Sequence, residues 1–215
     1  MKTTHAKKIG SLLLLLLLTL TAKAQVRYGL RTGIGYSSFI YKMEGQYQSG
    51  ARFGYGSAFV LDIPLKNKLS LRPELIYHNQ GGNFYTQKYA TEAYLKPDLV
   101  KSHFHSLQLP INLAYNIPLS DIQLTLMAGP AIDYSFAGNI SYDGSDRSVS
   151  FGTEESNDYK PFDLAVNIGF AAEYKHLFFQ ISSAFGVLDR KSTPYKEESA
   201  VLQNNVSFSL GYFFH

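Results

Sequence analysis

The most constraining feature of this sequence is a strict alternation of apolar side chains with polar or small ones. In residues 27–39, RYGLRTGIGYSSF, one face carries Tyr28, Leu30, Ile34 and Tyr36, and the other carries arginine, glycine and serine. Successive side chains of a β-strand point to opposite faces of its sheet. The segment is therefore predicted to be a strand with one apolar face and one small or charged face.

The same alternation recurs in seven further segments, which are separated by clusters of turn-forming residues. They are residues 52–63, 69–78, 105–116, 122–136, 162–174, 177–187 and 206–214. No helical spacing of apolar residues occurs between them, so the sequence predicts an all-β fold class.

The connections between these segments alternate between long and short. Long ones span residues 41–51, 79–104, 137–161 and 188–205, and short ones span residues 64–68, 117–121 and 174–177. Outer-membrane barrels have tight periplasmic turns and longer extracellular loops. We therefore expect an eight-stranded antiparallel up-and-down transmembrane β-barrel, with long surface loops at 79–104 and 137–161 and both termini in the periplasm.

The apolar face of each strand is expected to contact lipid, with tyrosine and phenylalanine near the strand ends. Lipid offers the backbone no hydrogen-bonding partner, so the sheet has to close on itself. Eight strands enclose a space that side chains largely fill, which favours small and charged residues on the inward face. A soluble lipocalin-like barrel would instead place its apolar side chains inside.

The first 24 residues have the features of a cleaved signal peptide. They contain a basic start, an apolar run and a small-x-small cleavage site, formed by Lys2, Lys7 and Lys8, by residues 12–18, and by Ala22-Lys23-Ala24. The apolar run is shorter than the ~20 residues of a membrane-spanning helix. We expect residues 25–215 to form a single barrel domain.

The charge of the remaining chain argues against nucleic acid as a partner. Four of the 20 basic residues lie in the signal peptide, which leaves 16 basic against 17 acidic residues. A nucleic-acid-binding domain is normally clearly basic. The chain also has no cysteine, which excludes a disulfide framework and a lipoprotein anchor.

The inward faces carry charged residues that are expected to form a network in the lumen. Its predicted members are Arg31, Arg52, Arg72, Glu74, Asp133 and Asp163. The arginines and the two aspartates fall on strands that lie on roughly opposite walls of an eight-stranded ring. Since an unpaired inward charge is costly, we expect pairs across the bore, with Glu74 as the short-range partner of Arg31.

Two constellations have the residue types of a metal or catalytic site. His78, His103 and His105 could bind a metal, but the alternation points His78 inward and the other two toward lipid. Ser106, His105 and Asp98 have the composition of a hydrolase triad without any nucleophile motif around the serine. We therefore predict no catalytic residue, no metal site and no cofactor.

Several segments resemble the PorT-like outer-membrane β-barrel domain family of Bacteroidota, whose members are often labelled porin-like. They are GLRTGIGYS near the start, LRPELIY at 71–77, LQLPINLAY at 107–115 and LMAGPAIDY at 126–134. The resemblance implies an eight-stranded barrel of OmpX-like architecture in a Gram-negative outer membrane. It implies no single activity, although some members serve protein secretion. Pro73 and Pro110 lack a ladder donor and are expected to mark bulges.

The predicted function is that of a monomeric, non-catalytic outer-membrane barrel. It is embedded in outer-membrane lipid and is either structural or engages a protein partner through its extracellular loops or its periplasmic face. A narrow small-solute pore is the first alternative, disfavoured because eight strands leave little continuous water. A lipid-modifying outer-membrane enzyme is the second.

Overall fold

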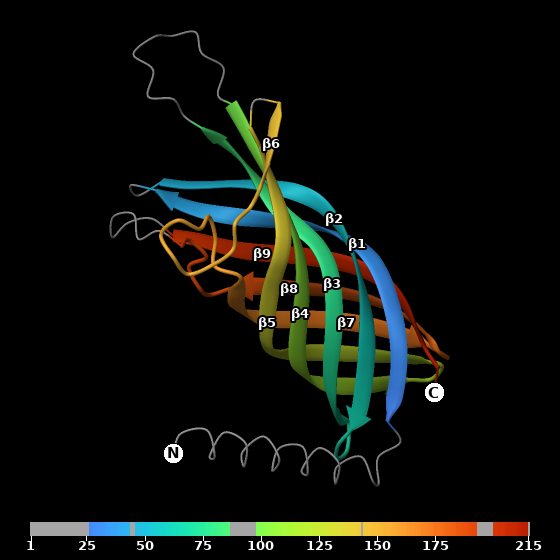
Figure 1. Ribbon diagram of the computed structural model, residues 1–215. Helices are drawn as coiled ribbons and strands as arrows, with labels where there is room; N and C mark the ends of the chain where they lie inside the picture. Colours follow the sequence, from blue (N-terminus) through green and yellow to red (C-terminus); the bar gives the residue numbers. More distant parts are fainter. Residues whose placement is uncertain (1–25, 44–45, 87–97, 143, 193–199, 215) are drawn as a thin grey trace, which may run out of the picture.

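The computed structural model describes residues 26–43, 46–86, 98–142, 144–192 and 200–214. In these residues eight long antiparallel strands form a closed barrel (Figure 1). They are β1 (Arg27–Met43), β2 (Gln46–Pro64), β3 (Leu69–Thr86), β4 (Asp98–Leu119), β5 (Ile122–Tyr142), β7 (Phe162–Tyr174), β8 (Leu177–Gly186) and β9 (Ala200–Phe213). The short strand β6 (Ser145–Ser148) pairs only with β5 and stands outside the ring.

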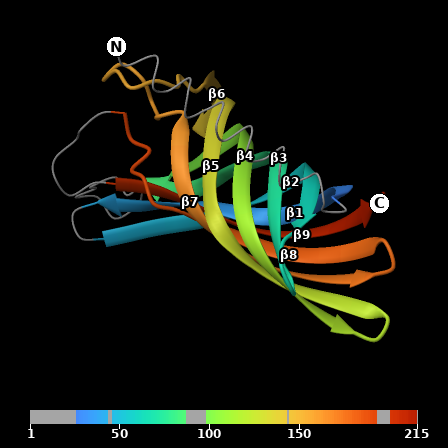
Figure 2. The same ribbon diagram turned by 90° about the horizontal axis from the view of Figure 1, so that it is seen from below.

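The ring follows chain order and closes between β9 and β1. Each barrel strand pairs with its neighbours in the sequence, and Leu30 pairs with Tyr212 across the closure. Figure 2 shows β3, β4, β5 and β7 side by side in one curved wall. The predicted fold class is thus confirmed. The predicted signal peptide, residues 1–24, lies outside the described residues.

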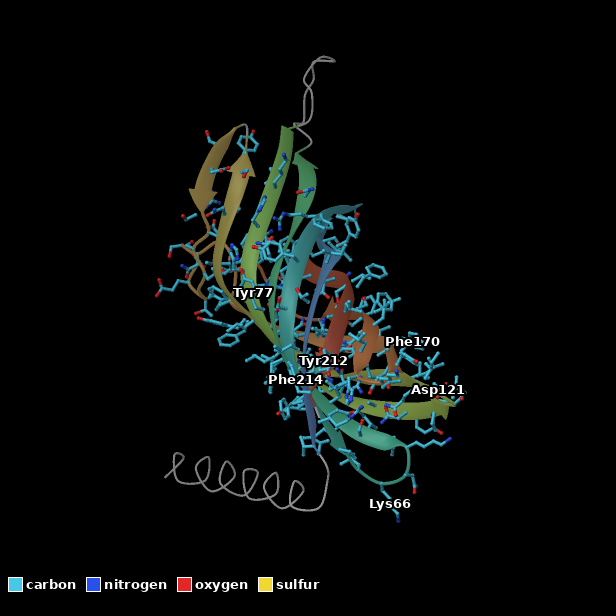
Figure 3. All side chains as sticks on the ribbon, turned by 90° about the vertical axis from the view of Figure 1, so that its right-hand side faces the viewer. Lys66, Tyr77, Asp121, Phe170, Tyr212 and Phe214 are labelled. Carbon is cyan, nitrogen blue, oxygen red and sulfur yellow. The ribbon has the colours of Figure 1, made fainter. Side chains whose placement is uncertain are left out.

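Three tight turns gather at one end of the barrel, which we call the turn end. Each contains a residue with positive φ, namely Asn67, Ser120 and Lys175. Lys66 and Asp121 mark two of these turns in Figure 3. Asparagine reaches this backbone conformation more readily than most residues, which suits the tight connection of β2 to β3.

At the opposite end the strands run further than the sequence suggested. Only residues 44–45 separate β1 from β2, β3 and β4 reach into the segment 79–104, and β5 with β6 occupies part of 137–161. The expectation of long loops throughout these three segments is therefore wrong. The apolar alternation stops where lipid contact is lost, whereas backbone pairing between strands continues beyond it.

The outward face of the barrel is apolar along its whole circumference. Exposed side chains include Leu30 and Ile34 on β1, and Leu107, Leu109 and Ile111 on β4. Aromatic side chains lie near the two ends of this band. One girdle contains Tyr36, Phe53, Tyr77, Tyr134, Phe136 and Phe162, and the other contains Tyr28, Tyr115, Tyr174, Tyr212 and Phe214. In the part of the chain that the structure describes, no helix is long and apolar enough to span a membrane.

Two shifts of register interrupt the ladders, and neither lies at a proline. Pro73 and Pro110 are flanked by pairs of unchanged register, so the expectation of bulges there is wrong. A residue without an N–H can leave out a ladder bond without adding a residue to its strand. The shifts lie instead at Phe136 of β5 and between Gly50 and Gly56 of β2, where the ladder with β3 is interrupted.

Candidate functional site

Charged side chains on β1, β2, β3 and β7 fill the lumen near the turn end. Arg27 donates from Nη1 to Glu173 Oε1 and from Nη2 to Asp62 Oδ2, both at 2.5 Å. Arg72 donates to the same Asp62 oxygen at 3.2 Å. The guanidinium carbons of Arg27 and Arg72 lie 4.4 and 5.4 Å from the ring centroid of Phe213. Two arginines therefore share one carboxylate and one aromatic ring.

A second layer of the same cluster is formed by Arg31 and Glu74. Nε and Nη2 of Arg31 donate to Glu74 Oε2 at 2.8 and 2.6 Å. Gln180 donates to the other carboxylate oxygen at 3.1 Å, and Arg31 Nη1 donates to Ser209 Oγ at 3.1 Å. Arg31 is 6% exposed and Glu74 1% exposed, so the pair is shielded from bulk water. Charge-assisted bonds of this kind are among the stronger hydrogen bonds in proteins.

We call these six residues, Arg27, Arg31, Arg72, Asp62, Glu74 and Glu173, the turn-end cluster. The strand register places them together. Arg27 pairs directly with Asp62 of β2, and Glu74 of β3 pairs with Val60, which lies two residues before Asp62 on β2. Apolar residues fill the space around the arginine stems, with Phe178 and Phe213 at a ring distance of 4.6 Å. Gly211 is required here because a Cβ would collide with Phe178 and with the stem of Arg31.

A cavity of about 50 Å³, lined by both polar and apolar side chains, lies beyond the turn-end cluster. Its lining includes Arg31, His78, Gln80, Gln108, Asn167 and Asn205. A site needs on the order of 10 to 15 Å³ of such volume to hold one water, so the cavity has room for a few ordered waters.

A second polar cluster closes the lumen on the far side of this cavity. Asp133 Oδ2 accepts a hydrogen bond from Gln80 Nε2 at 3.1 Å and lies 2.9 Å from His78 Nε2. Gln80 also donates to Ser106 Oγ, whose own neighbour is Ser135 Oγ at 2.6 Å. These five residues together with Arg190 form the mouth cluster.

Arg190 connects the mouth cluster to the segments that cover it. Its Nη1 lies 3.9 Å from Asp133 Oδ1 and donates to Gln203 Oε1 on β9. Its Nη2 donates to the carbonyl oxygens of Lys160 at 3.0 Å and Pro161 at 3.4 Å. The side chain is fully buried although it lies outside the strands. It therefore ties two connecting segments to the barrel wall.

These two segments, residues 149–161 and 187–192, form what we call the cap. Tyr159 of the cap packs on Phe39 and Phe104 of the wall, at ring distances of 6.0 and 5.1 Å. Phe151 contacts Phe104 edge-on at 5.2 Å. Ser192 Oγ donates to the Gly152 carbonyl at 2.8 Å and joins the two segments. The mouth is thus closed by an apolar layer over a polar one.

The structure places the six predicted lumen residues in four different settings. Arg31, Arg72 and Glu74 meet in the turn-end cluster, and Asp133 belongs to the mouth cluster. Asp163 accepts a hydrogen bond from the Leu188 amide at 3.2 Å. The expectation that Arg31 and Arg72 would reach across to Asp133 and Asp163 on the opposite wall is wrong, because Glu74 and Asp62 are nearer and pair with them. Pairing across the bore does occur between Arg27 of β1 and Glu173 of β7.

Arg52 is the member that departs most from its expected place. Its Nη1 donates to Asn79 Oδ1 at 2.7 Å and to the Gln80 carbonyl at 3.4 Å. Both acceptors belong to the stretch of β3 that does not pair with β2. The guanidinium therefore occupies the seam between these strands, outside the turn-end cluster.

The candidate metal and hydrolase groups are not assembled. His105 stacks against Tyr77, with Nδ1 at 2.8 Å from the tyrosine hydroxyl, whereas Ser106 points into the lumen. The side chain of Asp98 lies outside the described residues. In the described ranges, no three His, Cys, Asp or Glu side chains are grouped as metal ligands would be.

Sequence reasoning missed His78, Gln80 and Arg190 as parts of one site. The inward alternation of β3 and β4 would have indicated His78 and Gln80 as neighbours of Ser106, since His78 pairs directly with Ser106. No periodic signal marks Arg190, because it lies in a connection between strands. Its role depends on how that connection folds over the mouth.

Comparisons with known proteins concern the barrel as a whole. A family model described as outer membrane protein beta-barrel domain matches residues 21–190. Among solved structures, Neisserial surface protein A has 9% sequence identity and a TM-score of 0.46, covering 86% of this chain and 96% of that one. Ail, the attachment invasion locus protein of Yersinia pestis, has 12% identity and a TM-score of 0.40, with 86% and 98% covered.

The outer membrane enzyme PagL has 11% identity and a TM-score of 0.48, covering 86% of this chain and 98% of that one. At such identities the likeness concerns the fold alone. No curated protein sequence matches the chain.

Proposed function

Because the chain belongs to the family of outer membrane protein β-barrel domains, we propose that it is a non-catalytic barrel that engages a partner through its cap. The lumen is not the working surface in this proposal. The barrel serves as a rigid, membrane-embedded mount for the cap and for the protruding hairpin of β5 and β6.

The observation that carries this proposal is the closure of the lumen at both ends. The turn-end cluster fills one end with buried ion pairs, and the mouth cluster and cap fill the other. Between them, the described residues leave a cavity of about 50 Å³. A small-solute pore would need a continuous path of water, so closure favours partner binding over conduction.

A defined cap conformation also supports the proposal. Arg147 donates from Nη1 and Nη2 to the two carboxylate oxygens of Asp158, each at 2.8 Å. Ser150 donates to Asp158 through both its amide and its hydroxyl. These bonds fix the residues that flank the exposed tip at 153–156. A preformed surface loses less conformational entropy on binding than a mobile loop.

We place the cap outside the cell and the turn end in the periplasm, together with both ends of the mature chain. The short turns support this orientation, since tight turns are periplasmic in bacterial outer-membrane barrels. Within its family, the chain is proposed to belong with the PorT-like domains of Bacteroidota. The segments at 71–77 and 107–115 support that placement, and a link to protein secretion follows only from it.

Single-cysteine labelling tests the orientation, because the chain has no cysteine of its own. A membrane-impermeant maleimide should label Ser156→Cys on intact cells. Lys66→Cys, in a turn at the other end, should react only after the outer membrane is permeabilised. The reverse pattern would place the cap in the periplasm.

Site-specific photocrosslinking in the native outer membrane tests partner binding. A photoreactive residue at Thr153 or Ser156 of the cap should give a discrete adduct, and the same residue at Lys66 should not. Adducts from Lys66 alone would move the binding surface to the turn end. No adduct from any of the three positions would contradict the proposal.

A further inference from the structure

Arg52 differs from the other arginines in its lack of a carboxylate partner. Arg27, Arg31, Arg72, Arg147 and Arg190 each lie within 4.0 Å of an Asp or Glu oxygen. Across the described ranges, Arg52 has no such neighbour and bonds only to neutral oxygens. Arginine stays protonated at any physiological pH, so this positive charge is not neutralised by the described part of the chain.

The seam between β2 and β3 holds the guanidinium and leaves part of it available. Five residues of β2 face four of β3 between the pairs Gly50–Asn83 and Gly56–His78. Nη1 of Arg52 donates to the Asn79 side chain and the Gln80 carbonyl, which both lie in this gap. Within the described residues, Nε and Nη2 make no hydrogen bond. An arginine fork with free donors can bind an oxyanion in paired geometry.

Three further basic side chains lie beside this seam on the outer face of β4. Asn79, which binds Arg52, is paired directly with His105. Lys101 and His103 follow on the same face, at every second position from His105. Across β3, Gly81 pairs with His103, and Asn83 pairs both with Lys101 and with Gly50 at the end of the gap that holds Arg52. We call Arg52, Lys101, His103 and His105 the seam patch, and Asp146 on β6 borders it, since Ser141 of β5 pairs with both Lys101 and Asp146.

The seam patch lies where the apolar band of the barrel ends. His105 stacks on Tyr77 of the aromatic girdle and has Phe136 on its other side, at ring distances of 6.1 and 6.4 Å. Arg52 is adjacent to the girdle residue Phe53 in β2 and lies on its capped side. Aromatic girdles mark the level of the lipid headgroups. Lys101 and His103 therefore lie just beyond the hydrocarbon region.

We propose that the seam patch binds the phosphate group of a membrane lipid on the capped side of the bilayer. The fork of Arg52 and the ammonium of Lys101 supply the charge, and His103 and His105 supply ring N–H donors. The exposed side chains of Phe53 and Tyr55, with half-buried Tyr77, provide an apolar surface on the membrane side of the patch for the acyl chains. This inference goes beyond the proposed function, because it concerns the barrel wall and not the cap.

A lipid fits the patch better than free phosphate does. Free phosphate would use only the cationic part of the site and would exchange with water on the exposed side of Lys101. A lipid phosphate is held at this depth by its own acyl chains, and the basic residues face it at the same level. Lysine and arginine side chains near a membrane surface attract anionic lipids, so Arg52 and Lys101 together can select anionic over neutral headgroups.

Native mass spectrometry of the folded protein tests the proposal. The full mature chain in detergent micelles would be titrated with dioctanoyl phosphatidic acid, dioctanoyl phosphatidylcholine and inorganic phosphate. We expect retention of phosphatidic acid in preference to phosphatidylcholine. The variant Arg52→Gln with Lys101→Gln should bind phosphatidic acid at least roughly tenfold more weakly than the unmodified protein.

The matched control removes the same charge at the turn end, with Lys66→Gln and Lys68→Gln, and should leave binding unchanged. Heat-modifiable migration on gels shows whether each variant is folded. If Arg52→Gln fails to fold, Arg52→Lys keeps the charge and removes the fork, and should still weaken binding. Equal binding of phosphatidic acid by the seam variant and the unmodified protein would overturn the proposal. Inorganic phosphate bound as tightly as phosphatidic acid would overturn the assignment to a lipid.

Discussion

The two clusters that close the lumen are built from different parts of the chain. In the turn-end cluster every charged side chain stands on a barrel strand, and the ion pairs are 2.5 to 3.2 Å long. In the mouth cluster a single carboxylate, Asp133, is surrounded by His78 and Gln80, and its arginine lies 3.9 Å away. That arginine comes from the cap and not from the wall.

This difference suggests separate roles for the two ends. Strand register fixes the turn-end cluster, so its charges are held by the same hydrogen bonds that close the barrel. The mouth cluster is completed only when the cap folds down and brings in Arg190. We infer that damage to the first cluster destabilises the barrel, whereas damage to the second releases the cap and leaves the barrel closed at the turn end.

The largest expected effect is that of Glu74→Leu. Among the described residues, the substitution leaves the buried guanidinium of Arg31 with Ser209 as its remaining hydrogen-bond partner. Stranding one member of a buried ion pair typically destabilises a protein by about 3 to 5 kcal/mol. Urea unfolding in detergent micelles measures the change in the free energy of unfolding.

The double variant Arg31→Leu with Glu74→Leu is the control for this prediction. Replacing both partners removes the stranded charge, so it should be more stable than Glu74→Leu alone. Strictly additive losses would mean that the two residues do not interact and that the turn-end cluster is not a unit.

A smaller effect on unfolding is expected for Arg190→Met. The variant loses the bonds to Lys160, Pro161 and Gln203, and a hydrogen bond to a charged group contributes about 1.5 to 3 kcal/mol. We expect most of this loss to appear as local opening of the cap. The Lys160 amide, which donates to the Arg190 carbonyl at 2.7 Å, should exchange its hydrogen faster than strand amides.

Arg190→Lys is the matched variant, since it keeps the charge and loses the planar fork. Its cap should open less than that of Arg190→Met. A global loss of stability as large as that of Glu74→Leu would contradict the separation of the two ends.

The smallest effect is expected at the exposed pair of Arg147 and Asp158. An exposed ion pair contributes about 0 to 1 kcal/mol. The hydrogen bonds from Arg147 lower the pKa of Asp158 below its ordinary value. The pair therefore stabilises the cap tip above the unfolded-state pKa near 3.9, and this contribution is lost as the pH falls through the lower folded-state pKa.

Hydrogen exchange at the Ser150 amide, which donates to Asp158 at 2.9 Å, measures this change. In the unmodified protein its protection should fall at acidic pH. In Asp158→Asn it should be weaker throughout and should no longer depend on pH in that range. Equal pH dependence in both proteins would assign the change to another group.

The membrane-spanning half of the molecule could be predicted from sequence because one physical rule governs it. Lipid on one side and a narrow lumen on the other impose a period of two, which located all eight barrel strands and separated Leu30 from Arg31. The same rule placed Arg31, Arg72 and Glu74 inside. It did not indicate the inward ring of Phe213, because an apolar ring packed between arginine stems breaks the alternation.

The capped half could not be predicted in the same way. Beyond the lipid, both faces of a strand meet water or protein, so the alternation no longer reports where a strand ends. The register shift at Phe136 and the seam that holds Arg52 depend on how neighbouring strands bend. Arg190 becomes part of the mouth cluster only through the fold of the cap, which no local pattern in its sequence records.

Conductance across a planar bilayer tests the closed lumen most directly. The purified, folded monomer should give no steady channel at neutral pH, because the turn-end cluster and the mouth cluster each interrupt the path of water. Arg190→Met should also remain closed, since the turn-end cluster does not depend on the cap. Reproducible stepwise currents from the unmodified monomer would contradict closure at both ends and would restore the pore as the better account of this barrel.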